Sequence, residues 1–194
     1  LFFYEVYDWG LLQTDPNIGN YLLRLDDRRK KVAQDELVLL DFGSVLECPA
    51  DFLGHLRRTI DAGQRQNVPE LVAGLIGLGC LQADASEDGR KLFADFCLHL
   101  LEPLRPPAQL PAQYLNAKGE YRWGESQLMR RAGKQAAQSA VSRHFTTPSR
   151  DFALIARKLT GVFNVIVALD AEVNAHDMVQ ARILRWRDRE RRGA

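Results

Sequence analysis

A chain of 194 residues is long enough for one domain with a substantial core and too short for two domains of ordinary size. Its composition, 46% hydrophobic and 26% charged, is that of an ordinary globular protein. The formal net charge of +1 gives no reason to expect a nucleic-acid partner, and no apolar run is long enough to cross a membrane.

The front of the chain combines one apolar run with two short strand candidates. Residues 1–12 carry aromatic and aliphatic side chains almost throughout, which predicts a buried helix. A polar turn follows. The stretches "YLLRL" (21–25) and "ELVLL" (36–40) then predict the two strands of a hairpin, joined by the charged connector 26–35.

Beyond this hairpin the pattern is helical, interrupted by one proline-rich connection over 102–123. Apolar spacing and helix-start residues predict helices over 49–65, 68–79, 86–101, 125–142, 149–173 and from about 176 toward the arginine-rich end. We therefore expect a mainly α domain with a small β-hairpin. Within residues 1–194, residues 1–48 would hold the hairpin with its flanking turns and 49–194 the helical part.

Two polar turns flank the predicted hairpin. The first reads D-P-x-x-G-N from Asp15 to Asn20, and the second is the D-F-G of Asp41 to Gly43. A hairpin that starts just after Asn20 and returns just before Asp41 brings both side chains to one edge, and Asp15 projects into the same cleft. Phosphoryl transfer needs magnesium, held by a few oxygen ligands, and a carboxylate that orients the attacking hydroxyl.

The spacing therefore predicts Asn20 and Asp41 as magnesium ligands and Asp15 as the catalytic carboxylate. The protein-kinase catalytic loop has the same five-position separation between its aspartate and asparagine, followed by a D-F-G. Taken singly, Asp15 is also typical of an acid that stops a helix before proline, and Asp41 of an acid that caps a turn. The two motifs together, in this order and joined by a hairpin, favour the catalytic interpretation.

The sequence resembles the carboxy-terminal lobe of the UbiB/AarF family of atypical kinases. The family pattern H-x-D-P-H-P-G-N compares with Q-T-D-P-N-I-G-N here, and L-I-D-F-G compares with L-L-D-F-G. The likeness continues through the helical part. It implies the large lobe of a protein-kinase-like fold, with Asp15 as the catalytic-loop aspartate, Asn20 and Asp41 on magnesium, and Gly43 allowing the turn after Phe42.

The same resemblance implies ATP and Mg²⁺ as cofactors, and phosphoryl transfer or ATP hydrolysis in support of isoprenoid-quinone (ubiquinone) biosynthesis. A second interpretation stays open, in which the lobe is a non-catalytic nucleotide-sensing or lipid-binding scaffold. Three positions depart from the family pattern, since Gln13, Asn17 and Ile18 stand where it has two histidines and a proline. None of these changes removes a metal oxygen or the catalytic carboxylate.

The family's small amino-terminal lobe, with its nucleotide lysine and K-x-G-Q segment, has no counterpart in these residues. Lys118, Lys134 and Lys158 all follow the D-F-G, so we do not expect any of them to replace that lysine. We therefore expect the missing lobe to be a partner of this one, and the fragment alone to be inactive and to bind ATP poorly.

The remaining features have structural interpretations. Cys48, Cys80 and Cys97 form no metal-binding or disulfide pattern, which predicts reduced, buried thiols in a cytoplasmic compartment. The four histidines, at 55, 99, 144 and 176, have no ligand spacing. The arginines around Trp186 indicate either a solvated last helix or a segment that touches quinone lipid or an anionic membrane surface, and the sequence leaves both open.

Overall fold

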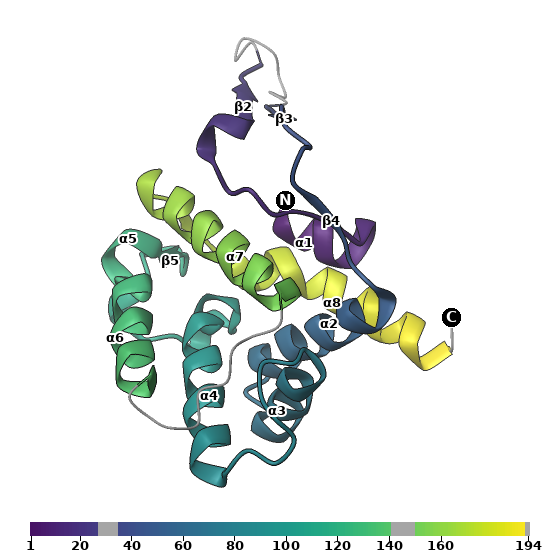
Figure 1. Cartoon of the computed structure of the whole chain (residues 1–194). Coiled ribbons are helices and arrows are strands. Elements are labelled where there is room, and N and C mark those ends of the chain that lie inside the picture. Colours follow the sequence, from purple (N-terminus) through teal and green to yellow (C-terminus); the bar gives the residue numbers. More distant parts are fainter. Residues whose placement is uncertain (27–34, 141–149, 193–194) are drawn as a thin grey trace.

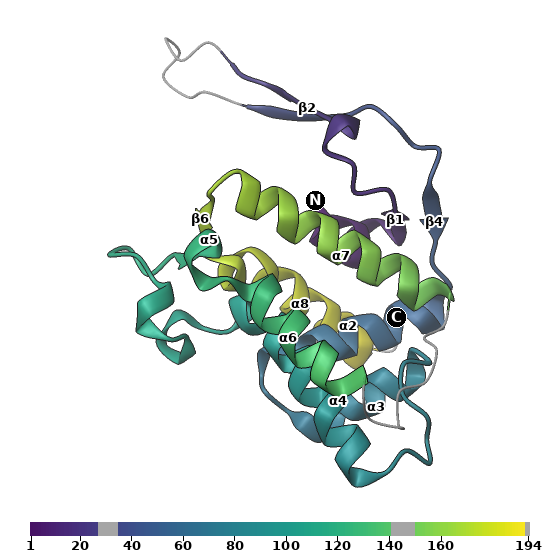
Figure 2. The same ribbon diagram turned by 60° about the vertical axis from the view of Figure 1, so that its left-hand side comes forward.

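The computed structural model describes residues 1–26, 35–140 and 150–192. Helices form most of the body, and a single hairpin projects away from it in both views (Figures 1 and 2). The β-structure consists of three separate two-stranded antiparallel pairs within the described residues. The predicted mainly α architecture with a small hairpin is confirmed.

The first turns of the chain are shorter than predicted. The helix α1 (Phe2–Tyr4) continues as a π-helical turn (Glu5–Trp9) and ends at Gly10, whose φ of 71° lies in the left-handed region. The predicted helix over 1–12 is therefore wrong at its end. Residues Leu11–Gln13 instead form β1, because glycine at position 10 lets the chain leave the helix at low cost.

Strand β1 pairs antiparallel with β4 (Val45–Glu47), with Leu12 opposite Leu46. The projecting hairpin consists of β2 (Tyr21–Arg24) and β3 (Glu36–Leu39), paired from Tyr21–Leu39 to Arg24–Glu36. This is the predicted hairpin. Most of the predicted connector, 27–34, lies outside the described residues.

The next three helices begin and end close to the predicted positions: α2 (Ala50–Gln64), α3 (Val68–Gly77) and α4 (Glu87–Leu100). Side-chain caps explain two of the starts. The Asn67 side chain accepts the backbone N–H of Glu70, and the Ser86 hydroxyl accepts that of Gly89. The proline-rich segment after α4 forms three short 3-10 turns, at Glu102–Leu104, Pro107–Gln109 and Ala112–Tyr114.

Two later helices differ from their predicted bounds. The helix predicted over 125–142 is two helices, α5 (Trp123–Ser126) and α6 (Leu128–Ala140), because Gln127 adopts a left-handed φ of 47°. The predicted residues 141 and 142 lie outside the described part. The long helix α7 (Arg150–Ala168) ends five residues earlier than predicted, shortly before Asp170, which has the same left-handed φ.

The chain then forms β6 (Glu172–Val173), which pairs with β5 (Tyr121–Arg122), and the last helix α8 (Ala175–Arg192). Helix α8 packs one face against the body, since Val179 and Ile183 are fully buried and Trp186 is nearly so. The Trp186 ring meets the Tyr7 ring edge to face, with centroids 6.4 Å apart.

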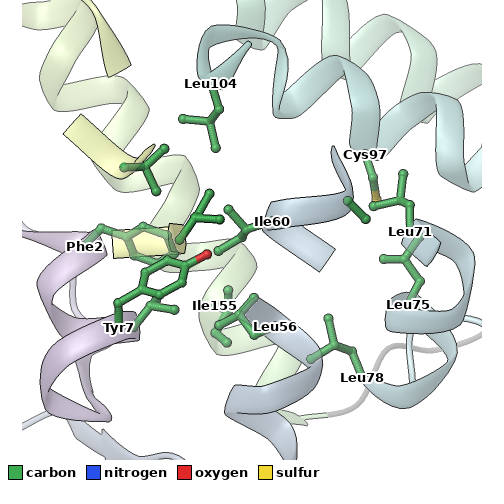
Figure 3. Packing of buried hydrophobic residues seen from close by; sticks show 14 of the residues in the cluster. Phe2, Tyr7, Leu56, Ile60, Leu71, Leu75, Leu78, Cys97, Leu104 and Ile155 are labelled. Carbon is green, nitrogen blue, oxygen red and sulfur yellow. The ribbon is translucent and has the colours of Figure 1, made fainter. Parts of the chain in front are cut away.

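One hydrophobic core joins these elements. Figure 3 shows Phe2 and Tyr7 of the first turns packing toward Ile60 of α2, while Leu71 and Leu75 of α3 face Cys97 of α4. This core holds the amino-terminal turns against the helical body, and so fixes the place from which β1 and the Asp15–Asn20 turn leave it.

Candidate functional site

The Asp15–Asn20 turn brings two of the predicted site residues into direct contact. A 3-10 turn (Ile18–Asn20) closes it, and the Asn17 side chain caps that turn by accepting the Gly19 N–H over 2.9 Å. The Asn20 side-chain Nδ2 then donates to Asp15 Oδ2 over 3.0 Å. Because the amide nitrogen is used in this way, the Asn20 Oδ1 oxygen is left as an acceptor for a cation.

Gln13 joins this turn to the D-F-G segment. Its Nε2 donates to the Asp41 carbonyl oxygen over 2.8 Å, and its Oε1 accepts the Asp15 backbone N–H over 2.5 Å. The side chain is buried, with 6% of Gln13 exposed. A single amide thus bridges the main chains of the two predicted carboxylate residues.

The neighbouring residue reinforces the bridge. The Thr14 backbone N–H and hydroxyl both donate to the Ser44 carbonyl oxygen, at 2.8 and 3.0 Å, and the two hydroxyls are 2.8 Å apart. The Leu40 N–H also donates to the Asn20 carbonyl, which extends the β2–β3 ladder by one pair. Asp41 is therefore one residue beyond the position opposite Asn20.

The D-F-G segment itself is exposed. Asp41 Oδ1 accepts the Gly43 N–H over 2.7 Å, and 63% of Phe42 is exposed. Gly43 does not use a left-handed backbone. A Cβ there would come 3.1 Å from Asp41 Oδ1, so the close approach of this carboxylate is what favours glycine.

Helix α7 forms the other wall of the site, a position that no local sequence motif indicates. The Arg157 Nη2 donates to Asp15 Oδ1 over 3.1 Å, although 142 positions separate the two residues. One turn further along α7, Gly161 lies against Pro16. Between the helix and the Asp15–Asn20 turn is an open groove of about 430 Å³, lined also by Asn164 and Val165.

A buried ion pair lies directly beneath this site. Lys158 Nζ donates to Glu5 Oε1 over 3.1 Å, and these side chains are 1% and 2% exposed. The same ammonium lies 3.3 Å from the hydroxyl of Tyr21, the residue after Asn20. Lys158 thus connects the first turns, β2 and α7 inside the protein.

The cysteines and histidines lie in environments that are explained by packing and hydrogen bonding. All three cysteines are free and buried, and burial raises the pKa of Cys48 to about 11 and that of Cys97 to about 12. Nδ1 of His176 lies 3.0 Å from both Gln64 Nε2 and the Leu104 carbonyl oxygen. Burial lowers the pKa of His99, and His144 lies outside the described residues.

Two arginines of the last helix make contacts within the protein. Arg187 pairs with the buried Asp61, and Arg182 donates to Asp8 over 3.1 Å while its guanidinium stacks 3.7 Å above the Tyr4 ring centroid. These two contacts are structural, whereas Arg185, Arg189, Arg191 and Arg192 are exposed. Among the described residues, no helix has the length and apolar character needed to span a membrane.

A mainly α body with an aspartate–asparagine turn and a D-F-G, joined by a hairpin, defines the large lobe of a protein-kinase-like domain. Residues 1–72 match the family model of the ABC1 atypical kinase-like domain. The chain is 24% identical over 171 residues to the probable serine/threonine-protein kinase abkA of Dictyostelium discoideum, which covers 88% of this chain and 28% of that protein. It is 25% identical over 180 residues to the mitochondrial atypical kinase COQ8B of Rattus norvegicus, which covers 91% of this chain and 30% of that protein.

The match over residues 1–72 and the two kinase relatives support the resemblance to the UbiB/ABC1 atypical kinases that the motifs predicted. The chain spans less than a third of the length of either relative.

Proposed function

We propose that the full-length protein containing this lobe performs ATP- and Mg²⁺-dependent phosphoryl transfer or ATP hydrolysis. In this proposal residues 1–194 are the large lobe, with residues 1–48 carrying the chemistry and 49–194 supporting it. The observation that carries it is the hydrogen-bonded set in which Asn20 contacts Asp15 and Gln13 bridges Asp15 to Asp41. Three oxygen-bearing side chains are thereby tied to one end of the hairpin.

The donor set fits magnesium. Asn20 Oδ1 and the exposed Asp41 carboxylate are hard oxygen ligands, and Mg²⁺ takes one or two protein ligands with phosphate oxygens and water completing its shell. The described residues contain no cluster of three or more His, Cys, Asp or Glu side chains able to hold a metal without such help. When bound, the ion would neutralise phosphate charge.

Asp15 would orient the acceptor and take its proton. Its half-buried carboxylate is held by Asn20 and opens into the groove beside α7. A volume of about 430 Å³ is in the range of small-molecule sites. We propose this groove as the route by which the acceptor hydroxyl reaches Asp15, since Asp15 lines it whereas Asn20 and Asp41 do not.

The biological role is proposed from the family resemblance, which implies support of isoprenoid-quinone biosynthesis. One observation favours the alternative of a non-catalytic nucleotide-sensing scaffold: the Asp15 carboxylate is already paired with Arg157. A contact with quinone lipid or a membrane surface, and a cytoplasmic location, stay predictions.

The test compares ATP turnover by the full-length wild-type protein with turnover by Asp15→Asn and Asp41→Asn variants. The exposed Asp95 of α4 supplies a control. Asp95→Asn makes the same change of charge, but at a position far from the site. Loss of turnover in both site variants, with the control active, supports the enzyme. Nucleotide binding without turnover in the wild type supports the scaffold.

The dependence of nucleotide binding on magnesium distinguishes the roles of the two aspartates. Because Asp41 would bind the ion and Asp15 would not, Asp41→Asn should weaken Mg²⁺-dependent nucleotide binding more than Asp15→Asn does. Calorimetric titration of Mg²⁺-ATP into each variant measures this difference, and equal losses would contradict the assignment.

A further inference from the structure

The Asp15–Asn20 turn lacks a cation. Residues 11–20, LLQTDPNIGN, contain no lysine or arginine. During phosphoryl transfer, negative charge spreads over the oxygens of the moving group, and catalysis depends on positive groups placed around it. A magnesium ion on Asn20 and Asp41 would lie on one side of that group, which leaves the acceptor side without a positive partner in this turn.

Arg157 supplies a positive group on that side. Among the described residues that line the groove, Arg157 is the one cation. Its guanidinium contacts Asp15 Oδ1 over 3.1 Å, and 58% of the side chain is exposed, so it is free to swing. The base of the side chain is held in place, because Gly161 packs on Pro16 one turn away on α7.

The Arg157 guanidinium is close enough to reach the transferring phosphoryl group. An acceptor oxygen lies about 2.6–3.2 Å from its base, and the phosphorus lies about 3–3.5 Å beyond that oxygen in a reactive arrangement. The phosphoryl group is therefore within about 6 Å of the Asp15 carboxylate that Arg157 already contacts. The adjacent Lys158 is excluded from this role by its buried pair with Glu5.

We propose that Arg157 is a catalytic residue that contacts the transferring phosphoryl group, and that its pairing with Asp15 is the resting arrangement. An exposed ion pair is weak, so the greater negative charge of a bound γ-phosphate draws the guanidinium away. Asp15 Oδ1 is then free. The bond from the acceptor oxygen to phosphorus forms as the bond from phosphorus to the ADP oxygen breaks, and the hydroxyl proton passes to Asp15.

This inference rests on the proposed function, and the experiment separates the two. Affinity for Mg²⁺-ADP is measured on the full-length protein with and without aluminium fluoride, which mimics the transferring group. The variants are Arg157→Gln and Arg157→Lys. Arg58→Gln is the matched control, since Arg58 makes a 3.1 Å ion pair with Glu190 at 53% exposure, far from the site.

Aluminium fluoride should tighten ADP binding in the wild type and in Arg58→Gln. In Arg157→Gln the increase in affinity caused by aluminium fluoride should be at least tenfold smaller than in the wild type, while the affinity for ADP alone stays within twofold of the wild-type value. Arg157→Lys should retain part of the increase. An equal gain in Arg157→Gln, or no gain in the wild type, overturns the inference while nucleotide binding stands. A parallel loss of ADP affinity and thermal stability also overturns it, because the residue would then be structural. Absence of any Mg²⁺-ADP binding by the wild type refutes the proposed function itself.

Discussion

Gly161 of α7 lies directly against Pro16 of the Asp15–Asn20 turn. A Cβ at position 161 would overlap Cβ and Cγ of Pro16 and come within 3.2 Å of its Cα. Backbone on both sides limits relaxation, so any larger residue must push the turn and the helix apart. Position 161 therefore sets the distance between Asp15 and the groove wall formed by α7.

Gly161→Ala should reduce activity more than stability. Overpacking costs about 1–3 kcal/mol, whereas alanine improves an interior helical position by about 1 kcal/mol, so the two effects partly cancel in the free energy of unfolding. The displaced turn does not recover its geometry, and we expect at least tenfold slower ATP turnover. Turnover and urea unfolding of the full-length protein measure the two effects.

Gly133 of α6 provides the control, because a Cβ there meets nothing within 4 Å. Gly133→Ala should stabilise the protein by up to about 1 kcal/mol and leave turnover unchanged. If Gly161→Ala behaves in the same way, the close contact with Pro16 does not position the turn.

A second prediction concerns the amide bridge of Gln13. Gln13→Ala removes both hydrogen bonds, to the Asp15 N–H and the Asp41 carbonyl, and leaves these groups without their partner. Loss of a residue that orients metal ligands typically costs about 10–100-fold in activity or metal affinity, and we expect a loss of that size in Mg²⁺-dependent ATP turnover. The magnesium concentration that gives the half-maximal rate should be higher in this variant than in the wild type.

Rescue distinguishes positioning from mere loss of packing. Histidine occupies this place in the family pattern and can also accept at one nitrogen and donate at the other. Gln13→His should therefore restore most of the turnover, while Gln13→Leu, which fills the space without hydrogen bonding, should not. Equal activity of the histidine and leucine variants would refute the bridge as a positioning device.

The parts of the site that could be predicted from sequence are those encoded locally. The hairpin, and the placement of the Asp15–Asn20 turn beside the D-F-G segment, follow from two short apolar runs and two short motifs within about forty residues. Arg157 could not be found in this way, since its contact with Asp15 joins distant segments. The sequence contains only an indirect indication of such a residue, namely that the Asp15–Asn20 turn has no cation of its own.

Errors in the predicted fold have a common cause. The prediction continues the first helix past Gly10 and treats the region of α5 and α6 as one helix across Gln127. It also continues α7 past Ala168 and Asp170. In each case one residue in the left-handed backbone region ends or interrupts the helix. Gln127 and Asp170 are not glycine, so residue type does not announce their left-handed backbone as it does at Gly10.

A third prediction concerns the buried pair of Lys158 and Glu5. Removing one partner leaves an uncompensated charge in the interior, so Lys158→Met should lower the free energy of unfolding by about 3–5 kcal/mol. The double variant Lys158→Met/Glu5→Leu buries no charge and should be more stable than Lys158→Met alone. Urea unfolding of the full-length protein tests this order, and additive losses would contradict it. The exposed pair Arg58–Glu190 is the control, where Arg58→Met should cost no more than about 1 kcal/mol.

The last prediction is a loss of stability in acid, which originates at Glu102. Its carboxylate accepts the Tyr121 hydroxyl over 2.6 Å and two N–H groups of Arg131 at 2.8 and 3.1 Å. Burial alone would raise the pKa of Glu102, but the hydrogen bonds from Arg131 and Tyr121 outweigh it and hold the pKa below its usual value. Burial also raises the pKa of Tyr121, so its hydroxyl keeps the proton that it donates.

Because the folded state holds the Glu102 pKa below the unfolded value of about 4.3, its contribution to stability is fully present above that value. It is lost as the pH falls from there through the folded pKa. Glu102→Gln should therefore destabilise the protein at pH 7, and the difference from wild type should shrink progressively below about pH 4. Thermal unfolding between pH 7 and 3 measures this, with the exposed Glu87→Gln as the charge-matched control. A wild-type–variant difference that stays constant across this range would mean that Glu102 acts through packing alone, and not through the charge that joins the 3-10 turn after α4 to β5 and α6.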